Sequence, residues 1–285
     1  NLKIFLKIML RNKKEDIIRK FIDQKEKGIP IIGGSAGNGL IAKCEESAGI
    51  DFIMVFNSGK FRLAGNGSLS GIMPYGNAND IVKNLALEII PIVKKTPVIA
   101  GVCCTDPFII PDKYIGQLFD LGFCGINNFP SVGIIDGMIR KNLEETGIGF
   151  EREVEFISIA NKLGMLTVPY VFNEDEGELM CKAGANIIIA HMGCTAGGSI
   201  GAKSYNSLDH CAQKIQLIID KIKSLNSKCI VLCQGGPISN PDEALYLLNN
   251  IDKLDGFCGA SSFERLPTEI SIKKTVEKFR YLRRN

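Results

Sequence analysis

Residues 185–191 read Ala-Asn-Ile-Ile-Ile-Ala-His, and a helical pattern follows over residues 208–224. Residues 229–233, Cys-Ile-Val-Leu-Cys, form the next short apolar run, and a second helical pattern covers residues 242–249. Runs that are apolar throughout are typical of parallel strands covered on both faces. This stretch therefore predicts two consecutive strand–helix units of a parallel sheet.

The same alternation extends from this stretch toward both ends of the chain. We expect strands, each followed by helical material, at residues 29–34, 51–57, 97–102, 124–128, 166–172, 185–191, 229–233 and 255–260. Eight βα units in about 250 residues are typical of a (β/α)8 TIM barrel. The alternative, a doubly wound open sheet, usually has fewer units. We predict a single α/β TIM barrel over residues 29–285, an N-terminal helical extension over residues 1–28, and an extended C-terminal helix.

Composition narrows the class of protein further. The chain has 285 residues, of which 45% are apolar and 23% charged, and its formal net charge is only +3. These values exclude an intrinsically disordered chain and give no reason to expect a nucleic-acid partner. Residues 1–10 are apolar and basic, but they are too short to span a membrane and make a poor signal peptide. The ten Cys include no Cys-x-x-Cys pair, so we expect reduced thiols, a cytoplasmic location and no membrane partner.

Polar residues follow the end of every predicted strand, where TIM barrels place their active sites. After the seventh and eighth strands come Gly235, Gly236, Ser261 and Ser262. Exposed amides in such turns can bind a phosphate or carboxylate. The alternative is that the Gly-Gly-Pro sequence is only a tight turn and the serines only cap a helix.

The segment after the second strand, residues 57–79, is long and rich in Gly and Asn, and we expect an irregular binding loop there. Lys60 and Arg62 lie near its start and could hold an acidic substrate, Arg62 through two parallel hydrogen bonds. The alternative is that both are solvated surface residues.

Asp106 and His191 are the candidates for acid–base chemistry. Asp106 follows the third strand in a short loop, where partial burial would raise its pKa. The alternative for Asp106 is an Asx turn before Pro107. His191 ends the sixth strand, and its alternative is a purely structural role. For Glu264 and Arg265 we expect a structural ion pair with no chemistry.

Strings at the strand ends resemble one known family along nearly the whole chain. They are residues 57–65 (NSGKFRLAG), 74–78 (PYGNA), 100–108 (AGVCCTDPF), 128–133 (NFPSVG), 142–147 (NLEETG), 169–173 (PYVFN), 190–193 (AHMG) and 259–267 (GASSFERLP). They resemble the phosphoenolpyruvate hydrolase-like family, also called TIM-barrel signal transduction proteins. More distantly, they resemble the phosphoenolpyruvate mutase and isocitrate lyase superfamily, which cleaves or rearranges C–C or C–P bonds in 2-oxo acids.

The distant resemblance implies a carboxylate site at the backbone amides of Ser58 and Gly59. It also implies a Mg²⁺ ion held by an Asp-x-Asp motif after the third strand. Here Gly101 and Cys103 occupy those positions, and Asn127 and Asn128 end the fourth strand where an acidic ligand is expected. Because Mg²⁺ prefers carboxylate oxygens, the metal site is in doubt, and Mg²⁺ is only a possible cofactor. The family's usual His before the Gly-Gly-Pro sequence is replaced by Gln234.

Together these features predict an enzyme that acts on a small acidic metabolite of the phosphoenolpyruvate or phosphonopyruvate type and cleaves a C–P, P–O or C–C bond. Asp106 and His191 would move protons. The substrate would be bound by Ser58, Gly59 and Arg62 at its carboxylate, by Gly235, Gly236, Ser261 and Ser262 at its other end, and by Asn128 and Tyr170 between them. The alternative is a non-catalytic barrel that senses a ligand or binds a protein. By analogy with the superfamily, we expect a homo-oligomer.

Overall fold

The computed structural model describes residues 13–284, so the apolar segment 1–10 and most of the predicted N-terminal extension's first half lie outside the described residues. All of its paired strands are parallel and belong to one sheet. They are β1 (Ile31–Ser35), β2 (Phe52–Val55), β3 (Val98–Gly101), β4 (Gly125–Asn127), β5 (Leu166–Thr167), β6 (Tyr170–Val171), β7 (Ile187–His191), β8 (Ile230–Gln234) and β9 (Gly256–Cys258).

The sheet closes through one interrupted strand. Its order runs from β5 through β1 and β9 to β6, so β5 and β6 form its two ends. These two ends are halves of the strand predicted at residues 166–172, separated by Val168 and Pro169. The Val168 amide still donates to Ile126 on one side (2.8 Å), and the Pro169 carbonyl accepts from Ile189 on the other (2.9 Å). The ring is therefore continuous, the predicted TIM barrel is confirmed, and the open doubly wound sheet is excluded.

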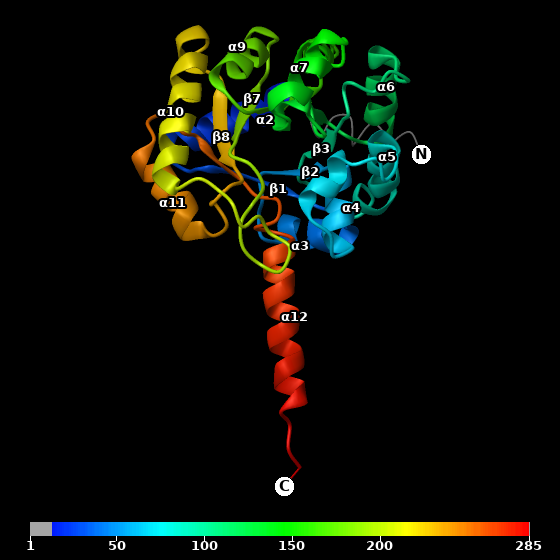
Figure 1. Ribbon diagram of the computed structural model, residues 1–285, viewed down its shortest axis with the longest axis vertical. Helices are drawn as coiled ribbons and strands as arrows, with labels where there is room; N and C mark the ends of the chain where they lie inside the picture. The colour runs from blue at the N-terminus through cyan, green and yellow to red at the C-terminus, as the bar shows by residue number, and fades with distance from the viewer. Residues whose placement is uncertain (1–12, 285) are drawn as a thin grey trace.

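Helices surround this ring, as Figure 1 shows. Those that follow successive strands are α3 (Gly39–Ser47), α5 (Ala78–Ile89), α6 (Pro111–Leu121), α8 (Phe150–Lys162), α9 (Glu174–Lys182), α10 (Leu208–Leu225) and α11 (Pro241–Asn250). The additional helix α7 (Gly137–Glu145) lies in the segment between β4 and α8. Helices α10 and α11 match the helical patterns predicted at residues 208–224 and 242–249 to within one residue, because each buries an apolar stripe against the barrel.

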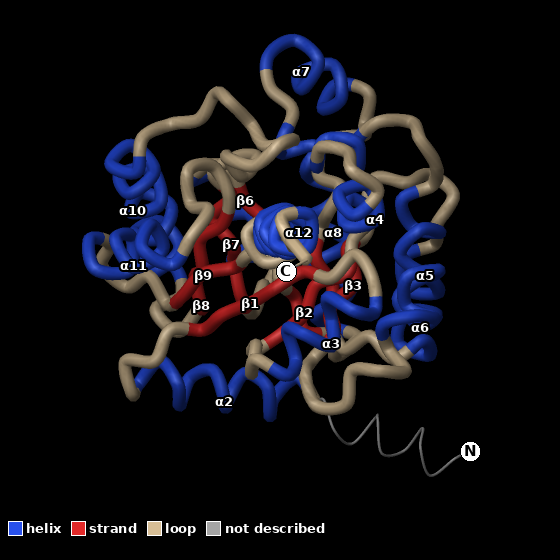
Figure 2. Tube along the Cα trace, turned by 90° about the horizontal axis from the view of Figure 1, so that it is seen from below, coloured by secondary structure: helices blue, strands red, loops and turns tan. Residues whose placement is uncertain are grey.

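The inside of the barrel is filled with side chains. Phe52, Phe56 and Phe129 belong to the inner apolar cluster, which also includes Phe21 of helix α2 (Lys14–Glu26). A Cβ atom on Gly33 would lie 2.1 Å from the Phe52 ring, so only glycine leaves room for that ring. Figure 2 shows α2 at the end of the barrel opposite the βα loops. The loop end is therefore the accessible end of the barrel.

One expectation about an irregular segment needs correction. Residues 57–79 are not one irregular loop, because they contain helix α4 (Asn57–Leu63) and the 3-10 helix η1 (Ser68–Ile72). The C-terminal helix α12 (Arg265–Arg280) is extended as predicted, and it leaves the ring between α11 and α3 and projects away from the barrel (Figure 1). No described helix is both long enough and apolar enough to cross a lipid bilayer.

Candidate active site

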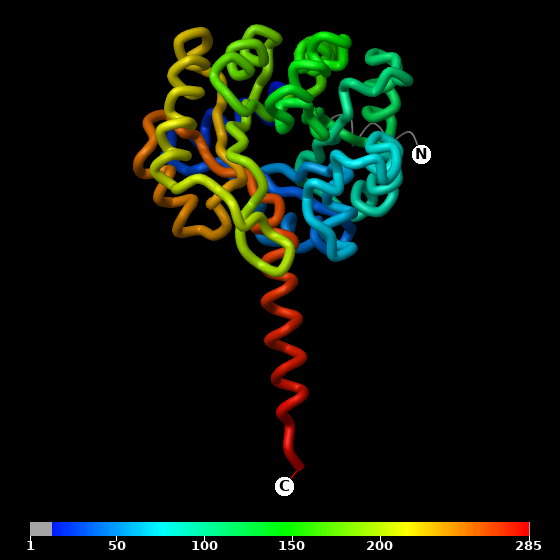
Figure 3. Tube along the Cα trace, in the orientation of Figure 1, coloured from blue at the N-terminus to red at the C-terminus, as the bar shows by residue number. Residues whose placement is uncertain are grey.

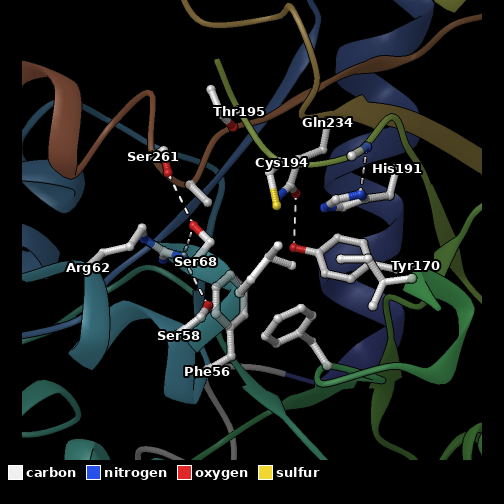
Figure 4. A pocket seen from close by; sticks show the side chains of 15 residues that line it. Phe56, Ser58, Arg62, Ser68, Tyr170, His191, Cys194, Thr195, Gln234 and Ser261 are labelled. Carbon is white, nitrogen blue, oxygen red and sulfur yellow. Dashed lines mark hydrogen bonds between the residues drawn. The ribbon is translucent and has the colours of Figure 1, made fainter. Parts of the chain in front are cut away.

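A small hollow, which we call the central cavity, lies among the βα loops (Figure 4). Its volume of about 30 Å³ is enough for roughly two water molecules. Strands β6, β7 and β8 and the segments after β2, β4, β7 and β9 contribute to its lining. The lining residues are Phe56, Ser58, Arg62, Ser68, Leu69, Phe129, Ile134, Tyr170, His191, Gly193, Cys194, Thr195, Gln234, Ala260 and Ser261.

Arg62 is the only positively charged side chain among these lining residues, and it is almost completely buried. Its Nε donates to Glu264 Oε2 at 2.6 Å in an ion pair whose side chains are 2% and 0% exposed. Its Nη1 donates to the hydroxyls of Ser58 (2.9 Å) and Ser68 (3.4 Å), and its Nη2 donates to Ser35 (3.1 Å). Because Ser35 also donates to Glu264 Oε1, both carboxylate oxygens are engaged. The guanidinium is therefore a fixed charge with its geometry set by four partners.

This network excludes one alternative and corrects one expectation. Arg62 is not a solvated surface residue, although Lys60, four positions into the segment, is exposed. Glu264 and Arg265 do not pair with each other: Glu264 binds Arg62, and Arg265 binds Glu269 at 3.2 Å. Glu264 is a component of the site that the sequence did not indicate, because its partner is 202 residues away in the chain.

His191, Gln234 and Tyr170 form the opposite wall of the cavity. The Tyr170 hydroxyl donates to Gln234 Oε1 at 3.0 Å, and the Tyr170 and His191 ring centres are 4.9 Å apart. The Gly193 amide donates to His191 Nδ1 at 3.1 Å, which places the proton of a neutral imidazole on Nε2. Gln234 Nε2 and His191 Nε2 are therefore hydrogen-bond donors, while the acceptor atoms of both side chains are already occupied.

Burial also sets the charge of this wall. It lowers the pKa of His191 to about 4, and nearby Lys214 lowers it further in the same direction. Burial likewise raises the pKa of Tyr170 well above its usual value. Near neutral pH, both groups are uncharged. This favours a role for His191 as a neutral hydrogen-bond donor rather than as a general base.

Asp106 lies in a different hollow, which we call the rim pocket. Its Oδ2 accepts from Asn79 at 3.0 Å, and its Oδ1 accepts from the Phe108 amide at 2.9 Å, which is the Asx turn named as the alternative. The rim pocket has a volume of about 450 Å³, and Cys103 also lines it. Burial raises the pKa of the Cys103 thiol. The structure thus separates Asp106 from His191, and the prediction that they act together loses its geometric basis.

Of the predicted site residues, Ser58, Arg62, Tyr170, His191 and Ser261 meet in the central cavity, and the other six, which include Asp106, do not line it. Gly236 donates to the Gly193 carbonyl (3.0 Å) and accepts from Ala196 (2.9 Å) in the turn that it forms with Gly235. The Asn128 side chain bonds to Glu153 (2.6 Å) and to the Tyr170 backbone. Ser262 lines an outer hollow, and the Gly59 amide donates to Phe56. These contacts match the turn alternative at the two glycines and a structural role for Asn128.

The sequence gives little or no indication of several residues that line the central cavity. The sequence marks Gln234 only by the absence of the family's usual His, yet its side chain lines the cavity and accepts a hydrogen bond from the Tyr170 hydroxyl. Ser68 lies in a helix that was predicted as irregular loop, and its hydroxyl is 3.5 Å from that of Ser261. The only feature of the sequence that points to Ser68 is the unusual length of the segment 57–79. Its contact with Ser261 depends on barrel closure.

The described residues 13–284 offer no group of three or more His, Cys, Asp or Glu side chains that could hold a metal ion. In the central cavity, the neighbouring carboxylate of Glu264 is already paired with Arg62. The side chains present therefore do not fit the magnesium site that the superfamily resemblance implies, and we derive no step through a metal ion.

The sequence relationships agree with this barrel. The model of the family described as phosphoenolpyruvate hydrolase-like matches residues 16–282. The chain belongs to this family. It is 52% identical over 264 residues to the ToMV susceptible protein tm-1(GCR26) of Solanum lycopersicum, and 51% identical over 268 residues to the ToMV resistance protein Tm-1(GCR237) of the same plant. These alignments cover 93% and 94% of this chain but only 35% and 36% of the tomato proteins. This family member thus spans little more than a third of their length.

Solved structures similar to this family member share its fold at low sequence identity. Phosphonopyruvate hydrolase, solved as a complex with oxalate and Mg²⁺, superimposes with a TM-score of 0.57 at 16% identity, covering 94% of this chain and 87% of that one. 2,3-Dimethylmalate lyase, a member of the phosphoenolpyruvate mutase/isocitrate lyase superfamily, gives a TM-score of 0.58 at 15% identity, covering 94% and 88%. At these identities the likeness shows the barrel fold alone.

Proposed function

We propose that the central cavity binds a small 2-oxo acid and that the protein is a hydrolase or lyase acting on a C–C, C–P or P–O bond of that acid. The observation that carries this proposal is the set of buried donors that face one small hollow. Ser58 and Ser68 accept hydrogen bonds from Arg62, so their own hydroxyl hydrogens are free to donate to a ligand. His191 and Gln234 present N–H groups from the opposite wall. A carboxylate and a neighbouring oxo group supply the matching acceptors.

The same donors can stabilise the negative charge that forms on the substrate during such a reaction. When the bond from C3 of a 2-oxo acid to its substituent breaks heterolytically, as in phosphonopyruvate, the electron pair stays on C3 and spreads onto the C2 oxygen as an enolate. The cleaved group passes to water, and the enolate then takes up a proton from solvent. Fixed donors aimed at the enolate oxygen stabilise that charge without reorganising during the reaction. A neutral imidazole in this position acts as a hydrogen-bond donor. In this proposal, His191 and Gln234 hold the oxo oxygen, while Ser58, Ser68 and Arg62 hold the carboxylate.

Ligand entry requires the segment 192–207, between β7 and α10, to move. Cys194 and Thr195 of this segment line the cavity, and its present volume is too small for an oxo acid. Figure 3 shows the segment beside the first turns of α12. Two hydrogen bonds hold it there: Arg265 Nη1 donates to the Gly197 carbonyl and the Ser199 amide donates to Glu269 Oε2, both at 2.8 Å. Opening would break these two bonds.

Calorimetric titration with oxalate, oxaloacetate and phosphonopyruvate tests this proposal. We expect saturable binding of at least one acid and its conversion to products detectable by NMR. His191→Leu removes the Nε2 donor at similar volume and should weaken binding about tenfold or more. The matched control is His210→Gln, because His210 is exposed on α10. Absence of binding by all three acids would contradict the proposal.

A second candidate function is a barrel that binds the acid but does not transform it. One observation favours it: within the described residues, no Asp or Glu lines the central cavity, and His191 is a poor base because its pKa is lowered to about 4. The same titrations separate the two functions. Binding without product formation over hours would support a sensor, whereas turnover would support an enzyme.

We also propose that the protein forms a homo-oligomer through α12. Every described residue from 270 onward is exposed, and Ile272, Val276 and Phe279 form a stripe at helical spacing. Between α11 and the start of α12 lies an apolar hollow of about 650 Å³ lined by Leu245, Leu248, Phe257 and Phe263 among others. The α12 helix of a second copy would cover it. Light scattering should give a mass above 31.1 kDa for the wild type and the monomer mass for Val276→Glu/Phe279→Glu.

A monomeric wild type would contradict this assembly.

We also propose that the protein is located in the cytoplasm. All ten cysteines are free and six of them are buried, which is compatible with the reducing environment of the cytoplasm.

A further inference from the structure

We propose that the central cavity binds its acidic ligand without a divalent cation, and that the buried Arg62–Glu264 pair and its serines supply the fixed positive pole instead. This inference rests on the proposed function, because it concerns how the same site holds a small acid. It follows from three observations: the space where a metal ligand would stand is filled, the nearby acceptor atoms are engaged or lie outside the cavity, and a permanent cation already stands at the site.

The first observation concerns space. Gly101 is the last residue of β3, at the position where the superfamily resemblance implies a metal-binding aspartate. A Cβ atom on Gly101 would lie 2.4 Å from Phe56 Cβ and 3.0 Å from the Phe129 carbonyl oxygen. The Phe56 and Phe129 rings pack with centroids 5.2 Å apart in the cavity floor. A carboxylate at position 101 would need both aromatic residues to move.

The second observation concerns the available oxygen atoms. Glu264 uses one carboxylate oxygen for Arg62 and the other for Ser35. Gln234 Oε1 accepts from Tyr170. The amide oxygens of Asn57 and Asn127 and both carboxylate oxygens of Glu45 are buried without a partner, but none of these three residues lines the cavity. Mg²⁺ requires near-octahedral oxygen coordination, and it usually takes one or two carboxylates from the protein. The cavity offers hydroxyl and N–H donors, which suit an anion rather than a cation.

The third observation concerns charge. The Arg62 guanidinium lies 5.4 Å from the centre of the Phe56 ring. Ser58 and Ser68 connect the guanidinium to the cavity. Their hydroxyl oxygens accept hydrogen bonds from Nη1, and their hydroxyl hydrogens can each donate a hydrogen bond to a ligand carboxylate. Glu264 balances the guanidinium charge, so the pair is neutral overall, but Arg62 lines the cavity and Glu264 does not, so the positive end of the pair faces the ligand. The guanidinium therefore attracts a bound anion, and no metal ion is needed to hold that anion in the cavity.

Two measurements on the complete purified chain test the inference. The first is direct titration with Mn²⁺, as a spectroscopic substitute for Mg²⁺, followed by EPR. We expect no saturable Mn²⁺ site, with or without oxalate. A stoichiometric site that oxalate strengthens would overturn the inference. Because this readout needs no turnover, it is independent of whether the protein is an enzyme.

The second measurement is oxalate calorimetry in EDTA and in excess Mg²⁺, with phosphonopyruvate hydrolase, whose oxalate complex contains Mg²⁺, as the metal-dependent reference. We expect equal affinity in the two buffers within about twofold. A loss of tenfold or more in EDTA would overturn the inference. Absence of binding in both buffers would contradict the proposed function, and the Mn²⁺ titration would still decide the metal question.

Serine variants connect the result to Arg62 without removing the buried ion pair. Ser58→Ala/Ser68→Ala deletes both hydroxyls through which the guanidinium reaches the cavity, and oxalate affinity should fall about tenfold or more equally in EDTA and in Mg²⁺. Ser70→Ala on the same helix η1 is the matched control, because Ser70 does not line the cavity. Unchanged affinity of the double variant would overturn the assignment of the positive pole to Arg62.

Discussion

The central cavity and the rim pocket lie at the same end of the barrel but differ in almost every property that matters for binding. The rim pocket has about 450 Å³ and the central cavity about 30 Å³. Yet Asp106 in the rim pocket is held by an Asx turn, and its neighbour Phe108 is 92% exposed. In the central cavity, Arg62 is 4% exposed and fixed by four partners. The comparison shows that preorganised buried donors, rather than volume, mark the better candidate site.

Breaking the buried Arg62–Glu264 ion pair should produce the largest difference in unfolding free energy between variants of the two hollows. Glu264→Gln leaves the Arg62 guanidinium buried without its counter-charge, and the unfolding free energy should fall by about 3–5 kcal/mol. Urea denaturation measures this loss. The partner variant in the rim pocket, Asp106→Asn, should lose less than about 1 kcal/mol. Equal losses from the two variants would remove the distinction between the two hollows.

Acid should destabilise the central cavity through His191. Its folded pKa of about 4 lies below the unfolded value of 6.5, so the unfolded state binds the proton first as pH falls. The stability that neutral His191 contributes is complete above pH 6.5 and decreases toward pH 4, by about 3 kcal/mol. His191→Leu should lack this part of the pH dependence, as measured by urea denaturation at intervals between pH 7 and 4. Parallel curves for variant and wild type would mean that the pKa is not shifted.

Removing one hydroxyl from the cavity wall should have a smaller effect. Tyr170→Phe leaves Gln234 Oε1 buried without its donor, which costs about 1–3 kcal/mol. Thermal denaturation at pH 7.5 measures it. Tyr246→Phe is the control, because the Tyr246 hydroxyl bonds Asp209 on the surface and should contribute less than about 0.5 kcal/mol. If both variants lose the same amount, the Tyr170–Gln234 bond is not part of a preorganised wall.

The smallest effect is expected for ligand binding after Asp106→Asn. Asp106 does not line the central cavity, so oxalate affinity should stay within about twofold of the wild type. A larger loss in calorimetric titration would show that the rim pocket takes part in binding and that the two hollows function as one site.

The barrel could be predicted from the sequence because its signals are local. Each continuous apolar run such as residues 187–191 needs cover on both faces, and each surrounding helix shows its own apolar stripe. Helix α6 also has a Pro at its first turn. The interruption of the fifth strand at Pro169 could not be placed, because the residues on either side still pair with their neighbours.

The site was only partly predictable because its contacts are long-range. His191 and Tyr170 could be placed by their positions at strand ends. The partner of Arg62 could not be identified, since Glu264 lies 202 residues further along the chain. Asp106 was assigned to the active site by the same positional rule, but its own Asx turn and Asn79 hold it in the neighbouring rim pocket. Local turn chemistry therefore outweighed position at the strand end.

A crystal structure of the protein with oxalate tests the central claim most directly. We predict oxalate in the central cavity, with one carboxylate accepting from Ser58 and Ser68 and the other from His191 Nε2 and Gln234 Nε2. We also predict no metal ion between oxalate and the protein when crystals are grown with Mg²⁺. Oxalate bound in the rim pocket near Asp106, or bound in the central cavity through a Mg²⁺ ion, would contradict it.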